Sequence, residues 1–147
     1  MPTPTPLEDR AAGARALVYV EVPRGSRVKR ELQGGRLVTE YISPFASPFN
    51  YGCVRAELST DGDPVDALVL GPPREAGTEV LVRIRGVVDF VDAGLADPKL
   101  VCSGAPPSPA ERLTVERFFR RYALARALLN RWQGKPGVTV FNGVRWR

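Results

Sequence analysis

Apolar residues in the first two-thirds of the chain either alternate with polar ones or form short runs, which is the pattern of β-strands. The glycine pair Gly34 and Gly35 predicts a tight turn between two strands, and Gly86 predicts a bulge or bend inside a long strand. Many short strands at close spacing favour a small barrel or sandwich. The expected strands cover residues 16–22, 28–32, 35–42, 66–70, 78–92 and 98–103.

Further along the chain, apolar positions recur every three or four residues, as they do on one face of an α-helix. Ser108 and Glu111 have the spacing of a capping box, Pro109 suits the first helical turn, and Gly134 can stop the helix. The sequence therefore predicts one long C-terminal helix over about residues 109–133. The expected apolar stripe of this helix consists of Val115, Phe118, Phe119, Tyr122, Ala125, Leu129 and Trp132.

The two ends of the chain complete the expected organisation. Residues 137–146 have the pattern of a strand with a turn at Asn142 and Gly143. Residues 1–12 are expected to form a disordered N-terminal tail, and residues 13–147 are expected to form a single domain. The expected fold class is mainly β (α+β), with strands first and the long helix near the C-terminus.

The amino-acid composition excludes some kinds of catalysis and favours an anionic partner. The chain has no histidine, which excludes Ser-His and Cys-His catalysis and disfavours a catalytic zinc site. The net charge of +5 suits an anionic partner such as phosphate or nucleic acid. Cys53 and Cys102 lie far apart in the sequence, so we expect both to be reduced and to serve packing. The first ten residues lack the pattern of a secretory signal and no apolar stretch is long enough to span a bilayer, so we expect a cytoplasmic protein without membrane contact.

An acidic cluster precedes one of the expected buried strands. Asp61, Asp63 and Asp66 lie within the hexapeptide DGDPVD. A turn alone would explain the aspartate, glycine and proline residues. Three carboxylates at this spacing repel each other, however, and a divalent cation such as Mg²⁺ or Mn²⁺ would relieve that repulsion. Together with other acids at strand ends, the cluster predicts a site for several metal ions. The other acids are Glu21, Glu31, Asp92 and Asp97.

The chain resembles the soluble family I inorganic pyrophosphatases. DGDPVD matches the family signature D-[SGN]-D-P-x-[DE] in full. The segments VYVEVPRGS, VKREL, PFNYG, DAGLADPKL and RFFRRY resemble further family segments in family order, from about Leu17 to Tyr122. The resemblance implies an OB-like five-stranded barrel with flanking helices. It also implies an inorganic diphosphatase that uses metal-activated water, with Mg²⁺ or Mn²⁺ as cofactor, to hydrolyse inorganic pyrophosphate to two phosphates.

The resemblance also implies roles for individual residues. Asp63 would accept a proton from the attacking water, and Asp66 would bridge two metal ions. The implied metal ligands are Asp61, Asp66, Asp97, Asp92 and Glu21. The residues implied to contact the phosphates or to line the site are Lys29, Lys99, Tyr122, Tyr51 and Glu31.

Four positions depart from the pattern of the family that the chain resembles. Glu40 replaces an arginine, Ser47 a tyrosine, Ala93 an acid and Ala123 a lysine. Arg126, four residues after the tyrosine of RFFRRY, is a candidate substitute for the missing lysine. The alternative function is therefore that of a divergent paralogue with weak or lost pyrophosphatase activity, which binds metal and another phosphorylated ligand.

The sequence also allows expectations about two kinds of partner, nucleic acid and further copies of the chain. Six arginines on the predicted helix and the OB-like barrel raise nucleic-acid binding as an alternative. The strands lack the interleaved exposed aromatics of a base-stacking platform, so nucleic-acid binding is not favoured. The resemblance to bacterial family members implies a homo-oligomer.

Overall fold

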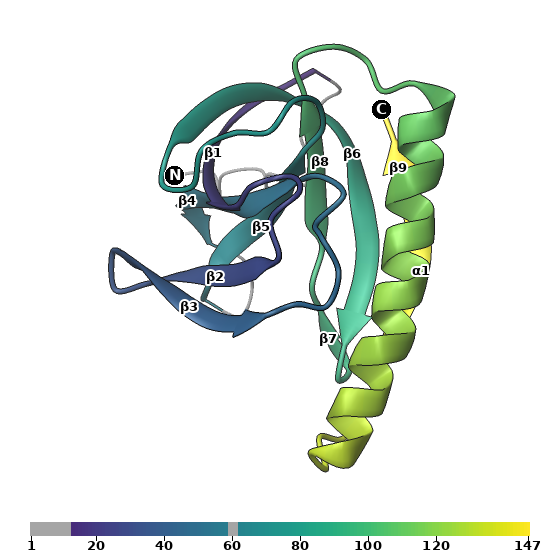
Figure 1. Ribbon diagram of the computed structural model, residues 1–147. Coiled ribbons are helices and arrows are strands. Elements are labelled where there is room, and N and C mark those ends of the chain that lie inside the picture. The colour runs from purple at the N-terminus through teal and green to yellow at the C-terminus, as the bar shows by residue number, and fades with distance from the viewer. Residues whose placement is uncertain (1–12, 59–61) are drawn as a thin grey trace, which may run out of the picture.

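Five strands close into a barrel in the computed structural model, which describes residues 13–58 and 62–147. The expected N-terminal tail and Asp61 lie outside the described residues. The barrel order is β1-β4-β5-β8-β6, and β6 pairs back onto β1 to complete the circle (Figure 1). The five strands are β1 (Arg15–Val22), β4 (Asn50–Leu58), β5 (Pro64–Val69), β6 (Glu79–Asp92) and β8 (Lys99–Ser103).

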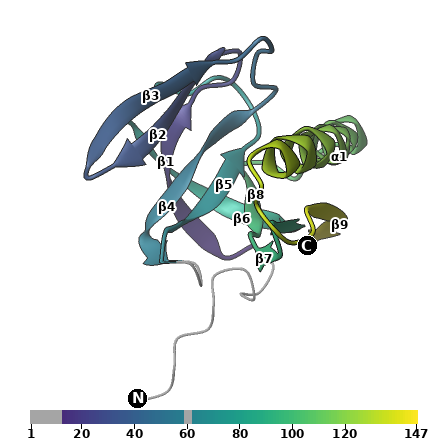
Figure 2. The same ribbon diagram turned by 90° about the horizontal axis from the view of Figure 1, so that it is seen from below.

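The remaining elements surround this barrel. A separate two-stranded hairpin of β2 (Val28–Gln33) and β3 (Arg36–Ile42) projects from it, on a different side from β9 (Figure 2). The short strand β7 (Leu95–Ala96) and the C-terminal strand β9 (Val140–Trp146) both pair with β6. Helix α1 (Pro109–Trp132) lies along the outside of the barrel (Figure 1). These elements confirm the expected fold class and the OB-like barrel.

Two glycine predictions have different outcomes. The register between β6 and β8 shifts between Ile84 and Gly86, which confirms the expected bulge. The expected turn at Asn142 and Gly143 is wrong, because β9 continues through both residues and pairs with β6 on either side of them. Gly143 has a φ of +103°, and the β6–β9 register shifts nearby. The Asn-Gly pair therefore forms an irregularity within one strand rather than a hairpin.

Two apolar clusters follow from the alternation of side chains along the strands. One cluster fills the barrel and includes Ala67 and Cys102. The second lies between the barrel and α1, where Leu68 packs with Phe119 of the helix. Cys53 and Cys102 are buried and free, as expected, and burial raises the pKa of each thiol to about 12.

The helix begins as the sequence predicts and departs from the prediction toward its end. Ser108 Oγ accepts a hydrogen bond from Glu111 N, and the Glu111 carboxylate accepts one from Ser108 N, which completes the capping box. The expected apolar stripe is wrong in its last turns, where Trp132 is 85% exposed and the polar Asn130 is buried. No helix in the described part of the chain is long and apolar enough to cross a membrane.

Gly52 allows β1 and β4 to approach closely. A Cβ atom at this position would collide with the backbone carbonyl of Tyr19, which cannot move without disturbing β1. We expect Gly52→Ala to lower the free energy of unfolding by about 1–3 kcal/mol, measured by chemical denaturation. Gly104→Ala is the matched control, because nothing lies within 4 Å of a Cβ there. Equal stability of the two variants would contradict this account of the close approach.

Candidate active site

Lys99 lies at the centre of the acidic cluster. The parallel pairing of β5 and β8 places Asp66 opposite Lys99. Lys99 Nζ lies 2.9 Å from Asp66 Oδ2 and 2.9 Å from Asp97 Oδ2, and the residue is only 1% exposed. Burial alone would lower the pKa of Lys99, but the charges of the two aspartates outweigh burial and raise the pKa. Lys99 therefore stays protonated and holds the two carboxylates together.

Negative charge nevertheless exceeds positive charge around Lys99. The pKa of Asp97 is raised, first by burial and further by the charges of Asp66 and Asp92, against the opposing effect of Lys99. A carboxyl group whose charged form is disfavoured in this way gains from a nearby cation. Carboxylate oxygens are also the ligands that Mg²⁺ and Mn²⁺ prefer. The described donors therefore fit a divalent cation in both charge and chemistry.

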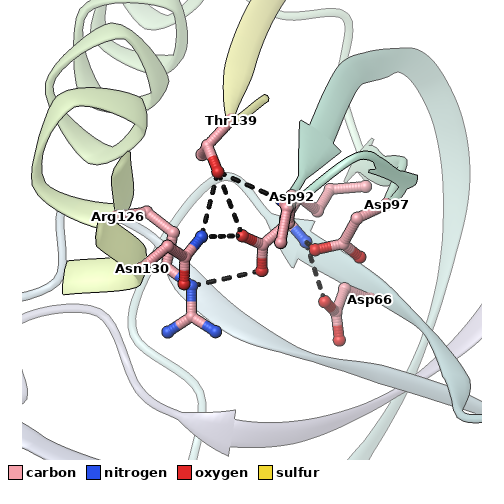
Figure 3. Close-up of polar contacts among 8 residues, drawn as sticks. Asp66, Asp92, Asp97, Arg126, Asn130 and Thr139 are labelled. Carbon is pink, nitrogen blue, oxygen red and sulfur yellow. Dashed lines mark hydrogen bonds and ion pairs between the residues drawn. The ribbon is translucent and has the colours of Figure 1, made fainter. Parts of the chain in front are cut away.

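Asp92, at the end of β6, faces helix α1 rather than standing free (Figure 3). Arg126 Nε lies 3.1 Å from Asp92 Oδ2, and Asn130 Nδ2 donates a 2.6 Å hydrogen bond to Asp92 Oδ1. The Thr139 hydroxyl lies 3.5 Å from the same oxygen and accepts a second hydrogen bond from Asn130. These contacts join the helix and the segment before β9 to the acidic cluster.

A second group of predicted residues lies between β1, β2 and β4. Glu21 is buried, and its carboxylate accepts a 2.5 Å hydrogen bond from Leu32 N in the hairpin. Burial raises the pKa of Glu21 to about 7. Lys29 Nζ lies 4.6 Å from the centre of the Tyr51 ring. The pKa of Tyr51 is raised well above its usual value, first by burial and then by Asp66, so Tyr51 connects the hairpin to the acidic cluster.

Glu40, one of the four departures expected from the sequence, lies in β3 next to the predicted site. The β2–β3 register shifts between Lys29 and Arg30, so Glu40 has no residue directly opposite it. A hydrogen bond with Glu31 raises the pKa of Glu40 to about 6, while the pKa of Glu31 is lowered, first by the same bond. Two hydrogen-bonded carboxyl groups, which share a proton below a pH of about 6, therefore lie beside Lys29.

The remaining predicted residues are Asp61, Asp63 and Tyr122. Asp61 lies outside the described residues. Asp63 is exposed and lines a shallow hollow of about 520 Å³ together with Glu31 and Arg55. Tyr122 packs its ring 5.5 Å from that of Phe90, and burial raises the pKa of its hydroxyl while the charges of Lys99 and Arg126 oppose that shift. The Tyr122 hydroxyl therefore interacts electrostatically with the acidic cluster, although its ring packs in the core.

The described donors are not yet arranged around a common point. Among residues 13–58 and 62–147, no three acidic or cysteine side chains form a group that could hold a metal ion. Asp66 and Asp97 instead turn toward Lys99, and Asp92 turns toward α1. Divalent cation binding would therefore require these carboxylates to exchange partners.

Sequence reasoning missed two residues of this site. Asn130 and Thr139 both contact Asp92, yet neither belongs to a recognisable motif. One signal was present: Tyr122, Arg126 and Asn130 follow each other at four-residue steps and share a helix face. No comparable signal marks Thr139, which reaches the site because β9 pairs with β6.

Comparisons with known proteins identify the family and the fold. The family model described as "Inorganic pyrophosphatase" matches residues 18–135. An inorganic pyrophosphatase of Nanoarchaeum equitans is 32% identical over 121 residues, which cover 71% of this chain and 76% of the relative. One of Gluconobacter oxydans is 38% identical over 90 residues, which cover 58% of this chain and 52% of the relative. The crystal structure of the Thermus thermophilus inorganic pyrophosphatase aligns with a TM-score of 0.74 and 25% identity, covering 97% of this chain and 91% of that one.

The matched lengths differ among these relatives. The chain spans about half the length of the Gluconobacter relative and about three quarters of the Nanoarchaeum relative. The region matched by the family model, residues 18–135, contains the strands that carry Asp66 and Lys99.

Proposed function

The chain belongs to the inorganic pyrophosphatase family, and from that premise we propose that it hydrolyses inorganic pyrophosphate to two phosphates in a reaction that needs a divalent cation. The observation that carries the proposal is the placement of Asp66 and Asp97 around buried Lys99, with Asp92 close by. Acidic groups for cations and a lysine for phosphate thus meet at the ends of adjacent strands.

Each role in the proposal has a physical basis in this chain. Asp61, Asp66 and Asp97 would hold Mg²⁺, with Asp92 and Glu21 at further cation positions. A bound divalent cation supplies charge neutralisation for the phosphates and a lowered pKa for a water molecule. Exposed Asp63 would accept the proton of the attacking water. The cationic contacts to the phosphate oxygens would come from Lys29 and Lys99, with the hydroxyl of Tyr122 as a further donor. Tyr51 and Glu31 would line the site.

Arg126 is proposed as a further phosphate contact. It approaches from α1, and its guanidinium pairs with Asp92 through Nε. It also interacts electrostatically with Tyr122 and Asp97, so it lies within reach of the acidic cluster. Ala123, the position of the family lysine, is buried in the cluster between barrel and helix. A cation from this helix face therefore comes more readily from Arg126 than from position 123.

The direct test is phosphate release from inorganic pyrophosphate by the full chain. We expect turnover with Mg²⁺, loss of turnover after a chelator removes the metal, and recovery when Mg²⁺ is restored in excess. Mn²⁺ in place of Mg²⁺ tests the choice of cation. Absence of phosphate release at high protein concentration with saturating Mg²⁺ would reject the proposal. Light scattering on the same sample tests the predicted homo-oligomer.

Glu40 gives a prediction that depends on pH. Its pKa is about 6, so its carboxyl group is neutral below that value and negative above it, facing Glu31, Lys29 and Arg126. Above pH 6, we expect Glu40→Gln to raise kcat/KM for pyrophosphate about fivefold, because one unit charge at a solvated site contributes about 1 kcal/mol. Below pH 6 the gain should fade. Glu75→Gln, which removes an exposed carboxylate elsewhere, is the control. A gain that is the same at all pH values would contradict the electrostatic cause.

A further inference from the structure

A groove lies directly beside the predicted phosphate contacts. It has a volume of about 770 Å³ and runs between the loop of residues 43–49 and helix α1. This volume falls within the range of small-molecule binding sites. Lys29, Tyr51 and Tyr122 line the groove, and the same three residues were assigned above to the phosphate side of the site. The groove therefore continues from the site.

The walls of the groove are aromatic. Phe45, Phe49 and Phe118 all line it. The rings of Phe49 and Phe118 meet edge to face at 4.8 Å between centroids, so this wall is fixed by packing. Phe45 is 79% exposed and lines the groove, so its ring is accessible to a ligand. An apolar or aromatic group could replace water against these surfaces, and that exchange is the main source of affinity in such a pocket.

The charge of the groove has one sign. Within the described part of the chain, its lining includes the cations Arg27, Lys29, Arg117 and Arg121, and it includes no aspartate or glutamate. A groove with aromatic walls and only positive charge suits a ligand that combines an apolar part with an anionic part. Inorganic pyrophosphate has no apolar part and is far too small to fill the groove.

The Glu31–Glu40 pair supports the same conclusion. Below a pH of about 6 the pair carries one negative charge and a shared proton, and above it both carboxylates are negative beside Lys29. A second phosphate with its full charge is repelled there. An organic group on that phosphate removes one ionisable oxygen, and the repulsion falls with it. Glu40 therefore disfavours inorganic pyrophosphate more than it disfavours an ester.

We propose, on the basis of the function proposed above, that the groove binds the organic group of a diphosphate monoester. A water oxygen attacks the terminal phosphorus, and the P–O bond to the bridging oxygen breaks. The bridging oxygen and its electron pair leave with the organic monophosphate. The proton of the water passes to Asp63, and the products are inorganic phosphate and an organic monophosphate. The terminal phosphate lies at the acidic cluster, and the organic group lies against Phe45 and Phe118.

The first measurement compares benzyl diphosphate with methyl diphosphate. Both carry one ester and the same charge, so they differ in the group that would enter the groove. We expect kcat/KM for benzyl diphosphate to exceed that for methyl diphosphate by about tenfold or more, because the ring leaves water on binding. Equal values for the two esters would overturn the inference, while turnover of inorganic pyrophosphate would leave the proposed function intact.

A pair of variants tests the location. Ala125 lines the groove and is exposed, so Ala125→Trp should fill the groove without disturbing the core. We expect it to lower the benzyl-to-methyl ratio to near one. Leu124 is 67% exposed and is absent from the lining, so Leu124→Trp places the same indole ring outside the groove and should leave the ratio unchanged. Equal effects of the two variants would overturn the inference. So would light scattering that shows Ala125→Trp dissociating an oligomer without changing the ratio, since a second copy would then occupy the groove.

Binding of the product analogue separates this inference from the proposed function. Benzyl phosphate should bind the wild-type chain by calorimetry, and Ala125→Trp should weaken binding about tenfold or more. If no diphosphate is hydrolysed but this binding pattern holds, the proposed function fails and the groove site stands. If benzyl phosphate does not bind, or binds both tryptophan variants equally, the groove site fails.

Discussion

Replacing Asp66 by asparagine is expected to lower kcat for pyrophosphate hydrolysis by about 10²–10³-fold, because a charged group that stabilises the transition state is removed. Asparagine keeps the size of the side chain but not its charge. Lys99 retains Asp97 as an ion-pair partner, so the strand ends should stay in place. The loss should appear in initial rates of phosphate release at saturating Mg²⁺.

Stability must be measured on the same variant. We expect Asp66→Asn to unfold at nearly the same denaturant concentration as the wild type, since Asp66 is about one-third exposed and an amide can still accept a hydrogen bond from Lys99. Glu75→Gln removes one negative charge from an exposed loop position and should keep full activity. Full activity of Asp66→Asn would show that Asp66 has no part in the reaction.

The second large effect is on stability. Lys99→Met should lower the free energy of unfolding by about 3 kcal/mol, because it leaves the carboxylates of Asp66 and Asp97 close together without their shared cation. This value is the lower end of the range for buried pairs, since both carboxylates are about one-third exposed. Chemical denaturation without divalent cations measures it. Lys135→Met, at an exposed position, is the control and should change stability little.

The same variant also reports on cation binding. In wild type, a divalent cation must compete with Lys99 for Asp66 and Asp97. We therefore expect Mg²⁺ to stabilise Lys99→Met more than it stabilises the wild type, as any ligand does when it binds the folded state more tightly. The triple variant with Asp66→Asn and Asp97→Asn should recover stability and lose the response to Mg²⁺. Equal responses of all three proteins would place the cation elsewhere.

Much of the fold could be read from the chain because local signals agree with the final packing. Ser108 and Glu111 are close in sequence and form their capping box without help from other elements. Gly86 bends β6 where the sequence places it. Asn142 and Gly143 have the chemistry of a hairpin turn as well, but pairing along β6 outweighs that preference. Local preference fails where a long-range partner offers more hydrogen bonds.

The site residues within one short segment could also be predicted, whereas contacts between distant segments could not. Apart from Glu21, the acids predicted to bind metal lie in two short motifs, and parallel pairing of β5 and β8 brings Asp66 to Lys99. The contacts of Asp92 cross more than thirty residues of sequence to reach Arg126 and Asn130. The three- and four-residue spacing of apolar residues extended the helix stripe to Trp132, yet the buried position near that end is Asn130, which hydrogen-bonds to the part-buried carboxylate of Asp92. Spacing within one segment cannot reveal such a partner.

The β2–β3 hairpin and the closed barrel carry different residues of the proposed site, and the two parts should differ in local stability. A two-stranded sheet is marginally stable on its own. Glu21 ties it to β1 through the amide of Leu32, and Lys29 rests on Tyr51. Its amides should therefore exchange with solvent deuterium well before those of the closed barrel. Lys29 and Glu40 belong to the hairpin, which we expect to open first, whereas Asp66 and Lys99 belong to the closed barrel, which we expect to open only when the whole protein unfolds. In the proposed reaction, opening of the hairpin would release the contacts of the leaving phosphate while the acidic cluster keeps its shape, which would provide a route for product release.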